Sequence, residues 1–273
     1  MLNKVGISKS GYYNWKNRKK SAREERKSRV IKEIKNIHEK SHEIYGAPKI
    51  TQELRKQGET ISERTVGQYM RENGIKAHYI KHRTRTTRDC DFSTTLHNIL
   101  KRDFHPVKPN TVWCTDITYI WTNDDGFVYL TSIMDLYSRK IISWKLSKTM
   151  EVEEVLECLE KVKQRRRIDK PVVIHSDRGV QFVSKKYKEL TAQMSRSYSR
   201  KGNPWDNACI ESFHSLIKRE WLKEKRIKNY EMAYTLIFEY IETFYNTVRL
   251  HSHCKFQSPD EYEQQFKLIE SLN

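Results

Sequence analysis

The chain has 273 residues, of which 37% are hydrophobic and 32% charged, and its net charge is +17. This length suits one large domain or two ordinary ones. No stretch approaches the roughly 18 apolar residues of a membrane span, and the N-terminus lacks a secretory signal pattern. Five scattered cysteines without a CxxC pair indicate reduced thiols and argue against a zinc site. The composition therefore excludes membrane and disulfide-stapled proteins, and it predicts a cytoplasmic location.

The positive charge is unevenly distributed. Residues 1–110 hold 26 Lys and Arg against 12 Asp and Glu, whereas residues 111–273 hold 26 against 23. An excess of this size favours a polyanionic partner, with salt-dependent phosphate contacts. Basic tails and ribosomal proteins share the pattern, but nucleic-acid binding is the favoured interpretation.

Residues 1–74 are predicted to form a helical DNA-binding region. A short amphipathic piece within residues 1–20 carries three aromatic side chains that could dock on a neighbour, Tyr12, Tyr13 and Trp15. Apolar residues recur at helical spacing within 21–41, and Pro48 suits the first turn of a helix through residue 56.

The next helix is delimited by a Ser cap at Ser62 and a Gly stop at Gly74. Two short helices joined by a tight turn resemble a helix-turn-helix, with Arg64, Thr65 and Gln68 facing outward as candidate DNA contacts. A small helical packing module is the alternative. Residues 75–110 read as a basic linker that either orders on DNA or forms a solvated loop.

From residue 111 the pattern changes to that of an α/β domain, predicted over 111–225 and followed by a C-terminal helical extension over 226–273. Strands and helices are expected in the order of a ribonuclease-H-like domain, namely three strands, a helix, a strand, a helix, a strand and a helix. Their ranges are 111–121, 127–136, 139–147, 151–167, 171–177, 182–194, 195–199 and 205–224, with further helices over 230–246 and from Pro259.

Three carboxylates occupy distinctive local frames in this domain. Asp116 lies inside an apolar strand, Asp177 closes another strand, and Glu211 lies on a helix. A buried ionised carboxylate costs several kcal/mol unless a cation or donors compensate it. Open α/β sheets place ligands at the carboxyl ends of their strands. Taken singly, each acid could equally be a capping or surface residue.

Carboxylates without His or Cys between them suit Mg²⁺ or Mn²⁺ rather than zinc. Two such ions can activate an attacking oxygen and stabilise a leaving one in phosphoryl transfer. Lys218 lies seven residues after Glu211, on the same helix face, where it could hold a DNA phosphate.

Several other polar residues have two interpretations. His175 and Arg178 flank Asp177 and are expected near the scissile DNA, although they could instead fix the bend after the strand. Arg200 and Lys201 belong to a basic segment that we expect to contact DNA. Arg249, in the aromatic and basic tail with Tyr245, Asn246 and His251, either grips DNA or packs.

The remaining residues of these motifs are expected to be structural. Asp206 or Asn207 is expected to cap the helix that carries Glu211. Asp135 is read as a structural acid bonded to the neighbouring strand. Three tryptophans are read as core residues, Trp113, Trp121 and Trp144.

Nearly the whole chain resembles the DDE transposases of bacterial insertion sequences, specifically the second-frame product of the IS-three family, which is related in core fold to retroviral integrases. The matching segments occur in the family's order: GISKSGYYNW, IHEKSHEIYGAPKITQELRKQG, ISERTVGQYMRENGIKA, WCTDITYI, IMDLYSRKIISW, HSDRGVQF, SRKGNPWDNACIESFHSLIKRE and YNTVRLHSHCKFQSPDEY. By this resemblance Asp116, Asp177 and Glu211 are the catalytic, metal-binding acids, and Lys218 is the family's helix lysine.

The resemblance implies a transposase that cleaves element ends and joins the 3′-hydroxyl to DNA, through a branched or circular form of the element. It also implies two Mg²⁺ or Mn²⁺ ions, terminal inverted repeats and target DNA as substrates, and no membrane. A homo-oligomer is expected, as is an upstream-frame OrfA protein as a partner. The expected location is the bacterial cytoplasm, in association with the nucleoid.

The chain departs from the family pattern at two places. Residues 178–210, 33 positions, separate Asp177 from Glu211, which is two fewer than is usual, and Lys255 stands where a Gly commonly precedes the aromatic. The shortened spacing keeps open an inactive DNA-binding remnant or regulator. A nuclease of the same fold that does not join strands is a second rival, which only a strand-transfer assay separates from a transposase.

Overall fold

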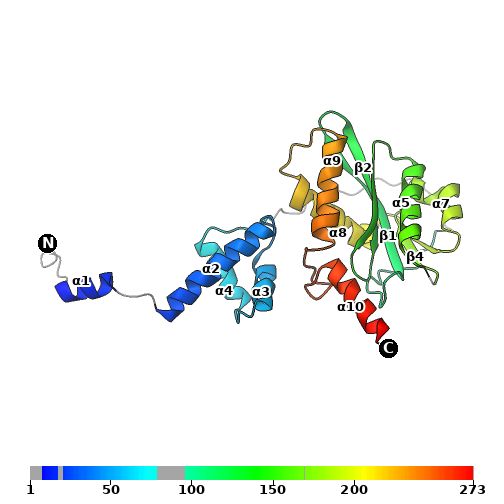
Figure 1. The fold of residues 1–273 in the computed structure, drawn as a ribbon. Helices are drawn as coiled ribbons and strands as arrows, with labels where there is room; N and C mark the ends of the chain where they lie inside the picture. The colour runs from blue at the N-terminus through cyan, green and yellow to red at the C-terminus, as the bar shows by residue number, and fades with distance from the viewer. Residues whose placement is uncertain (1–7, 18–20, 79–95, 169, 273) are drawn as a thin grey trace. The chain divides into compact units, whose positions relative to one another are not determined.

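The computed structural model describes residues 8–17, 21–78, 96–168 and 170–272 (Figure 1). The chain divides into two compact units, Met1–His78 and Tyr79–Asn273. Each unit has its own buried apolar residues, so each is stabilised from within.

The first unit begins with an isolated helix. α1 (Lys9–Lys16) starts at Ser8, whose side chain accepts a hydrogen bond from the Gly11 amide, and no residue of this helix is buried. Tyr13 and Trp15 are 54% and 70% exposed. These two side chains therefore pack into no core of the described residues, and their docking on a neighbour stays a prediction.

Three further helices form the body of this unit. α2 (Ala22–Lys40) begins with a capping box in which Ser21 and Glu24 satisfy each other's backbone amides. α3 (Ala47–Lys56) has a proline in its first turn, and α4 (Glu63–Glu72) is capped by Ser62. Their apolar faces meet in a small core, which includes Ile34, Ile50, Leu54 and Val66. The predicted helical arrangement and its cap at Ser62 are confirmed.

The second unit contains a five-stranded sheet of order β3-β2-β1-β4-β5. The first three strands are antiparallel, and β4 and β5 run parallel to β1. Gly126 adopts a positive φ of 73° in the turn of the β1–β2 hairpin. The strands are β1 (Val112–Thr122), β2 (Gly126–Asp135), β3 (Ile141–Ser147), β4 (Val173–Ser176) and β5 (Ser195–Tyr198).

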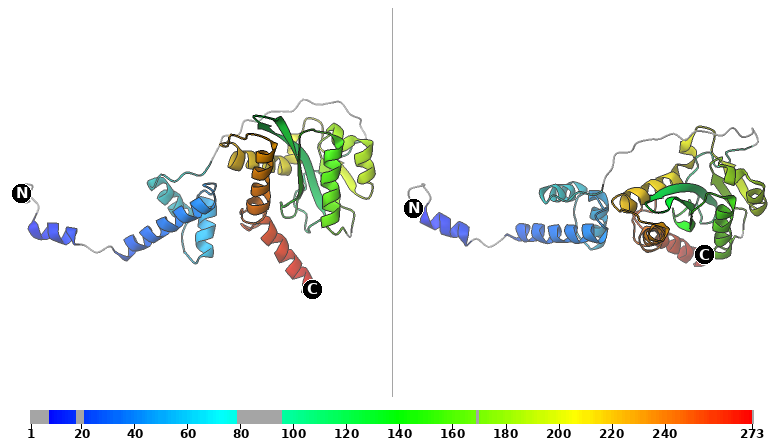
Figure 2. Two further views of the ribbon diagram at one scale, coloured as in Figure 1. Left: turned by 45° about the horizontal axis from the view of Figure 1, so that its top comes forward. Right: turned by 90° about the horizontal axis from the view of Figure 1, so that it is seen from above.

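Helices cover both faces of this sheet (Figures 1 and 2). α5 (Val152–Arg165) packs on β2 and β3, and its apolar residues join a core that includes Trp113 and Ile133. α8 (Ala208–Ile217) packs on β1 and β2 from the other face. Because side chains alternate along a strand, Asp116 points away from the face that carries Trp113 and toward α8.

The later helices are more interrupted than the sequence suggested. The helix expected over 182–194 is two short helices, α6 (Val180–Val183) and α7 (Lys185–Leu190), because Ser184 caps the second of them. The helix expected over 205–224 changes pitch twice, and so does not run as one α-helix. Its parts are η2 (Pro204–Asn207), α8 and the π-helical η3 (Lys218–Leu222). The next helix likewise changes from α9 (Tyr230–Phe238) to the π-helical η4 (Glu239–Tyr245).

The C-terminal segment is tied to the sheet by buried polar groups. Asn246 bonds both the amide and the carbonyl of Ile141. α10 (Pro259–Ser271) starts with a capping box at Ser258, and Glu263 accepts a hydrogen bond from Ser138. Lys255 adopts a φ of 54°, so the turn forms with a lysine in a left-handed conformation that favours glycine. The Gly-to-Lys departure has therefore not abolished this turn.

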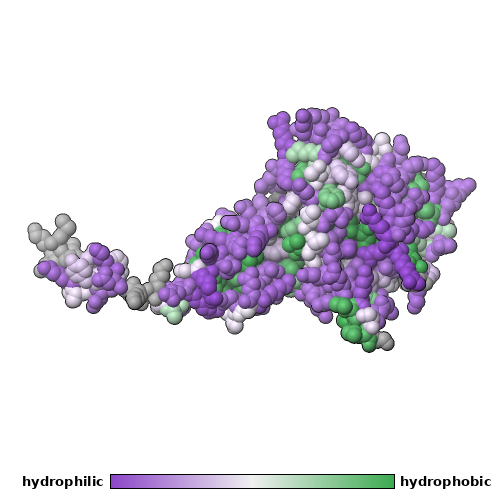
Figure 3. Space-filling view, viewed as in Figure 1, coloured by the Kyte–Doolittle hydropathy of each residue, from purple (hydrophilic) through white to green (hydrophobic). Residues whose placement is uncertain are grey.

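Several large apolar side chains are exposed on the surface. The face shown in Figure 3 is mostly hydrophilic, with a hydrophobic patch at the end of α10, where Leu268, Ile269 and Leu272 are exposed. Trp121 is 56% exposed and is therefore not a core residue, unlike the fully buried Trp113. Among the described residues, no helix has both the length and the apolar character needed to cross a bilayer.

Only part of the predicted linker belongs to the described residues. Residues 79–95 lie outside them, but residues 96–110 pack into the second unit. Leu100 is buried, and its amide donates to the Ser197 hydroxyl. The His97 carbonyl accepts a hydrogen bond from the Tyr198 amide beside β5. This part of the linker is therefore a structured edge of the sheet domain.

Candidate active site

A notch in the sheet brings two of the predicted acids to one edge. β4 pairs with β1 only along Val112–Cys114, and beyond that point β1 continues without it. Asp116 lies two residues past the last paired position of β1, and Asp177 directly follows the last residue of β4. Asp177 therefore lies at the carboxyl end of β4, and Asp116 lies within β1 beside that end, where open α/β sheets place ligands.

Asp177 and Glu211 lie in the electric field of the other acids. Loss of hydration, and then the negative charge of Asp116, raise the pKa of Asp177 to about 6, although the Gly179 amide donates to this carboxylate. Loss of hydration, followed by the charges of Asp116 and Asp177, raises the pKa of Glu211 to about 7. Both residues remain accessible from the solvent. The notch thus concentrates negative charge.

Two basic side chains, on the Glu211 helix and its π-helical continuation, lie near Asp116. His214 was not singled out from the sequence; its Nδ1 lies 3.4 Å from Oδ2 of Asp116. The side chain of Lys218 packs over the ring of Tyr119, 4.6 Å from its centroid. Burial lowers the pKa of Lys218, and the charge of Asp116 opposes that shift. The spacing of His214, three residues after Glu211, is the signal that could have revealed it.

The carboxylates share a field without forming a ready-made metal cluster. Among the residues that the structure describes, no group of three or more His, Cys, Asp or Glu side chains is close enough to hold a metal ion. The available donors are nevertheless carboxylate oxygens, which suit hard divalent cations such as Mg²⁺ and Mn²⁺. The raised pKa values of Asp177 and Glu211 mark an uncompensated negative charge that such a cation would relieve.

The segment before α8 is held by a buried acid that does not act as a helix cap. Asp206 is fully buried and accepts hydrogen bonds from the guanidinium groups of Arg200 and Arg102 and from the side-chain amide of Asn98. The guanidinium of Arg200 is the main reason that the pKa of Asp206 lies well below its usual range. Asn207 occupies the cap position, but its side chain makes no capping hydrogen bond. The expected cap is therefore replaced by a clamp that fixes the approach to Glu211.

His175 is placed inside the fold. It is fully buried, and its two ring nitrogens lie 2.9 and 3.1 Å from the hydroxyls of Ser197 and Ser199. Its burial argues against the DNA contact predicted from its position beside Asp177. Arg178 donates to the carbonyls of Ser199 and Leu96, so it fixes the bend after β4.

The buried state of His175 predicts a pH dependence of stability. Burial lowers its pKa from 6.5 to about 4, so the stabilisation is fully present above about pH 6.5 and is lost as the pH falls toward 4. Relative to a His175→Gln variant, the native chain should lose roughly 3 kcal/mol more unfolding free energy over this range. Urea unfolding at several pH values measures the difference. Parallel pH profiles for the two proteins would contradict the prediction.

Arg249 and Asp135 also have structural roles. Arg249 is only 6% exposed and forms a bidentate ion pair with Glu220, at 2.7 and 2.6 Å, which replaces the predicted DNA contact. Asp135 is fully buried and accepts hydrogen bonds from the amides of Asn110 and Tyr137. The latter pattern agrees with a structural acid, although its partners lie outside the neighbouring strand. Lys201 is exposed.

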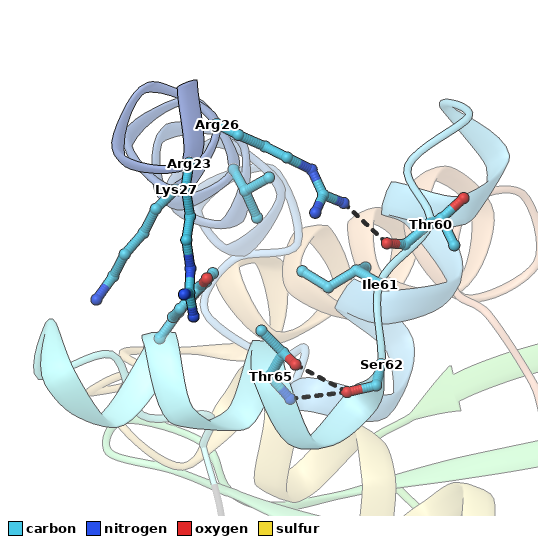
Figure 4. A pocket seen from close by; sticks show the side chains of 9 residues that line it. Arg23, Arg26, Lys27, Thr60, Ile61, Ser62 and Thr65 are labelled. Carbon is cyan, nitrogen blue, oxygen red and sulfur yellow. Dashed lines mark hydrogen bonds between the residues drawn. The ribbon is translucent and has the colours of Figure 1, made fainter. Parts of the chain in front are cut away.

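The first unit offers a separate basic pocket between α2 and α4 (Figure 4). Its volume is about 290 Å³, and its lining includes Arg23, Arg26 and Lys27 of α2. Arg26 donates to the Thr60 carbonyl, and Lys27 pairs with Glu72. Partners therefore hold Arg26 and Lys27 of this pocket in place.

The three predicted contacts on α4 do not share one environment. Arg64 and Gln68 are exposed, whereas Thr65 is half-buried, lines the basic pocket and bonds the Ser62 hydroxyl. Gln68 donates to Glu72. Arg64 and Gln68 thus present the outward face of the helix, and Thr65 faces α2.

Family models match both units of the chain. A model described as an HTH-like domain matches residues 25–83, and two models described as an integrase core domain match residues 106–204 and 192–259. The sheet order, the helices on both faces and these matches define the class. The second unit is an integrase core of the ribonuclease-H-like type, and the first is an HTH-like helical region.

Relatives extend over nearly the whole chain. Transposase InsF for insertion sequence IS3A of Escherichia coli (strain K12) is 33% identical over 96% of this chain and 92% of its own length. An uncharacterized 31 kDa protein of insertion element IS600 from Shigella sonnei is 32% identical over 97% of this chain and 98% of its own length. The HTLV-2 integrase catalytic core domain in complex with magnesium is 15% identical, with a TM-score of 0.44, over 57% of this chain and 98% of that one. The chain belongs to the IS3 family of insertion-sequence transposases.

Proposed function

We propose that this protein cleaves the ends of an insertion element and joins the freed 3′-hydroxyl to DNA. The observation that carries the proposal is the mutual electrostatic influence of Asp116, Asp177 and Glu211 at the β1–β4 notch. Repulsion among three carboxylates costs stability in the metal-free protein, so an arrangement that retains it fits a cation-binding role better than a structural one.

In this proposal, Asp116, Asp177 and Glu211 would hold two Mg²⁺ or Mn²⁺ ions. Such ions, when bound, activate the attacking oxygen and stabilise the leaving one in phosphoryl transfer. The protein's own part is positioning. Asp116 is fixed by its strand and Asp177 by the Gly179 amide, while the Asp206 clamp anchors the segment that precedes Glu211.

Lys218 would hold a DNA phosphate beside the acids. Its side chain is half-buried and lies over Tyr119, in the field of Asp116, which places a cation next to the proposed reaction centre. We expect Lys218→Ala to reduce strand cleavage about 10- to 100-fold, because a charge-assisted phosphate contact contributes roughly 1.5–3 kcal/mol. Cleavage of a labelled element end measures this effect.

Lys218→Arg and Lys185→Ala are suitable controls. Arginine retains the charge, so it should recover part of the activity. Lys185 is an exposed cation on α7 that has no proposed role in binding DNA, so its replacement should leave cleavage unchanged. Equal activity of Lys218→Ala and the native protein would remove Lys218 from the reaction centre.

DNA recognition is assigned mainly to the first unit. Arg64 and Gln68 present the outward face of α4, with Thr65 behind them, and the cations of the basic pocket lie beside that helix. Arg200 and Lys201 would add backbone contacts in the second unit. The proposed substrates are terminal inverted repeats and target DNA, bound by a homo-oligomer and with an upstream-frame OrfA protein as a partner. Binding to DNA would place the protein at the bacterial nucleoid.

The test is a reconstitution with labelled element ends, Mg²⁺ or Mn²⁺, and the purified protein with and without its upstream-frame partner. Strand cleavage at the element end, followed by joining of a pre-cut end to target DNA, is the expected result. Cleavage without joining would instead indicate a hydrolytic nuclease of the same fold.

One alternative is favoured by specific observations. The spacing of 33 residues between Asp177 and Glu211 is short for the family, and the described residues hold no ready-made metal cluster. These features are compatible with an inactive DNA-binding remnant or regulator. Tight binding to the element ends with no cleavage under any metal and partner condition would establish that alternative.

A further inference from the structure

The β1–β2 hairpin carries a cluster of aromatic side chains on the protein surface. Tyr119, Trp121 and Phe127 are 55%, 56% and 48% exposed. Trp121 and Phe127 lie opposite each other across the strand pair, with ring centroids 4.9 Å apart, and Tyr119 lies 5.3 Å from Phe127. Because residues 119 and 121 are two positions apart in a strand, their side chains share one face. We call these three residues the aromatic platform.

The platform is linked to the proposed reaction centre through Lys218. Asp116 and Tyr119 lie three positions apart in β1, so their side chains point to opposite faces of the strand. Lys218 packs over the Tyr119 ring and also lies in the field of Asp116. β1 is beyond its pairing with β4 at this point. A strand of DNA that leaves the acids and passes around this open edge of β1 would therefore reach Tyr119 before Trp121.

Cations border the hairpin at its other end. The amides of Asn123 and Asp124, in the hairpin turn, donate to the carbonyls of Ile227 and Lys228, which fixes the segment 223–228 beside the turn. This segment carries one acid and four exposed cations, Lys223, Lys225, Arg226 and Lys228. Figure 1 shows the hairpin and the start of α9 at the same end of the unit.

Exposed aromatic faces beside a cationic border match the chemistry of single-stranded nucleic acid. Bases stack on aromatic side chains whatever their sequence, and phosphates bind along the cations. A protein interface also has an apolar centre and a polar rim. The border here is polar but almost entirely cationic, with four cations against one acid, which favours a polyanionic partner.

We infer that the aromatic platform binds unpaired bases of the DNA strand next to the scissile phosphate. The inference rests on the proposed function in taking DNA to be the substrate at the Asp116 notch. It adds a docking surface for single-stranded DNA on the hairpin, distinct from the helices of the first unit. Because stacking on an aromatic ring does not distinguish the four bases, the platform is expected to bind bases of any identity.

The test measures binding of the full chain in EDTA to three short DNA duplexes, so that cleavage plays no part. The duplexes end bluntly, in a single-stranded overhang, or in the same overhang without bases. The native protein should bind the overhang about 10-fold more tightly than the baseless overhang, as one stacked base contributes roughly that factor.

Trp121→Ala should abolish this difference and leave binding to the blunt duplex unchanged, while Trp121→Phe should retain part of it. Phe238→Ala, which removes an aromatic side chain of similar exposure on α9, should behave like the native protein. An undiminished preference in Trp121→Ala would overturn the inference, as would its absence from the native protein. A change in self-association alone would instead assign the platform to a protein interface.

Failure of the proposed function has a different outcome. If the protein prefers the overhang through Trp121 but never cleaves DNA with Mg²⁺ or Mn²⁺, the inference about the aromatic platform stands and the proposed transposition chemistry is wrong.

Discussion

Replacing Asp116 with Asn is expected to reduce Mg²⁺-dependent strand cleavage by about 10³-fold or more, since a metal-binding carboxylate supplies several kcal/mol of transition-state stabilisation. Binding to the element ends should be almost unchanged, because the proposed recognition surface lies in the first unit. Gel-based cleavage and binding assays on the same DNA measure both effects. Asp177→Asn and Glu211→Gln should behave alike.

A second readout separates this role from a structural one. In the metal-free protein, the charge of Asp116 raises the pKa values of Asp177 and Glu211. Its removal relieves repulsion, so Asp116→Asn should leave the melting temperature unchanged or raise it. Asp124→Asn, at the exposed turn of the same hairpin, is the matched control and should cleave normally. Near-native cleavage by Asp116→Asn would show that this acid is wrongly assigned.

Arg249→Met is expected to destabilise the second unit by about 3–5 kcal/mol, because it leaves Glu220 charged in a buried site without its bidentate partner. The side chains of Arg249 and Glu220 are only 7% and 5% exposed. Urea or thermal unfolding measures the loss. If Arg249 instead gripped DNA, the variant would keep its stability and lose affinity.

Two comparisons sharpen this result. The double variant Arg249→Met with Glu220→Leu removes both charges and should recover much of the stability. Lys186→Met breaks an ion pair with Glu153 in which both side chains are more than half exposed, and it should change the unfolding free energy by less than about 1 kcal/mol.

Local patterns predicted the framework of this protein. The strands and most of the helices were expected because apolar periodicity and caps such as Ser62 act over a few residues. The integrase-core order of strands and helices also followed from the sequence. The helix interruptions could not be predicted in this way, since the change of pitch at Lys218 follows no break in apolar spacing.

The roles of polar side chains were less predictable, because they depend on residues distant in the chain. His175 flanks Asp177 in sequence, yet its partners lie on β5 and just beyond it, at Ser197 and Ser199. Asp206 has the sequence context of a cap, but one of its two guanidinium partners, Arg102, is 104 positions away. Trp121 shows the converse, since a large apolar residue in a strand was expected in the core and is exposed.

The Asp206 clamp also determines where the catalytic unit can be separated from the rest of the chain. A fragment that starts at residue 111 would contain β1 and every proposed catalytic acid, yet it would lack Asn98 and Arg102. Asp206 would then keep only the Arg200 guanidinium and amide as its partners among those described here. The stretch leading to Glu211 would be left loosely anchored. A minimal autonomous core therefore has to begin no later than Leu96, whose carbonyl accepts a hydrogen bond from Arg178, and so it includes part of the segment that was predicted to be a linker.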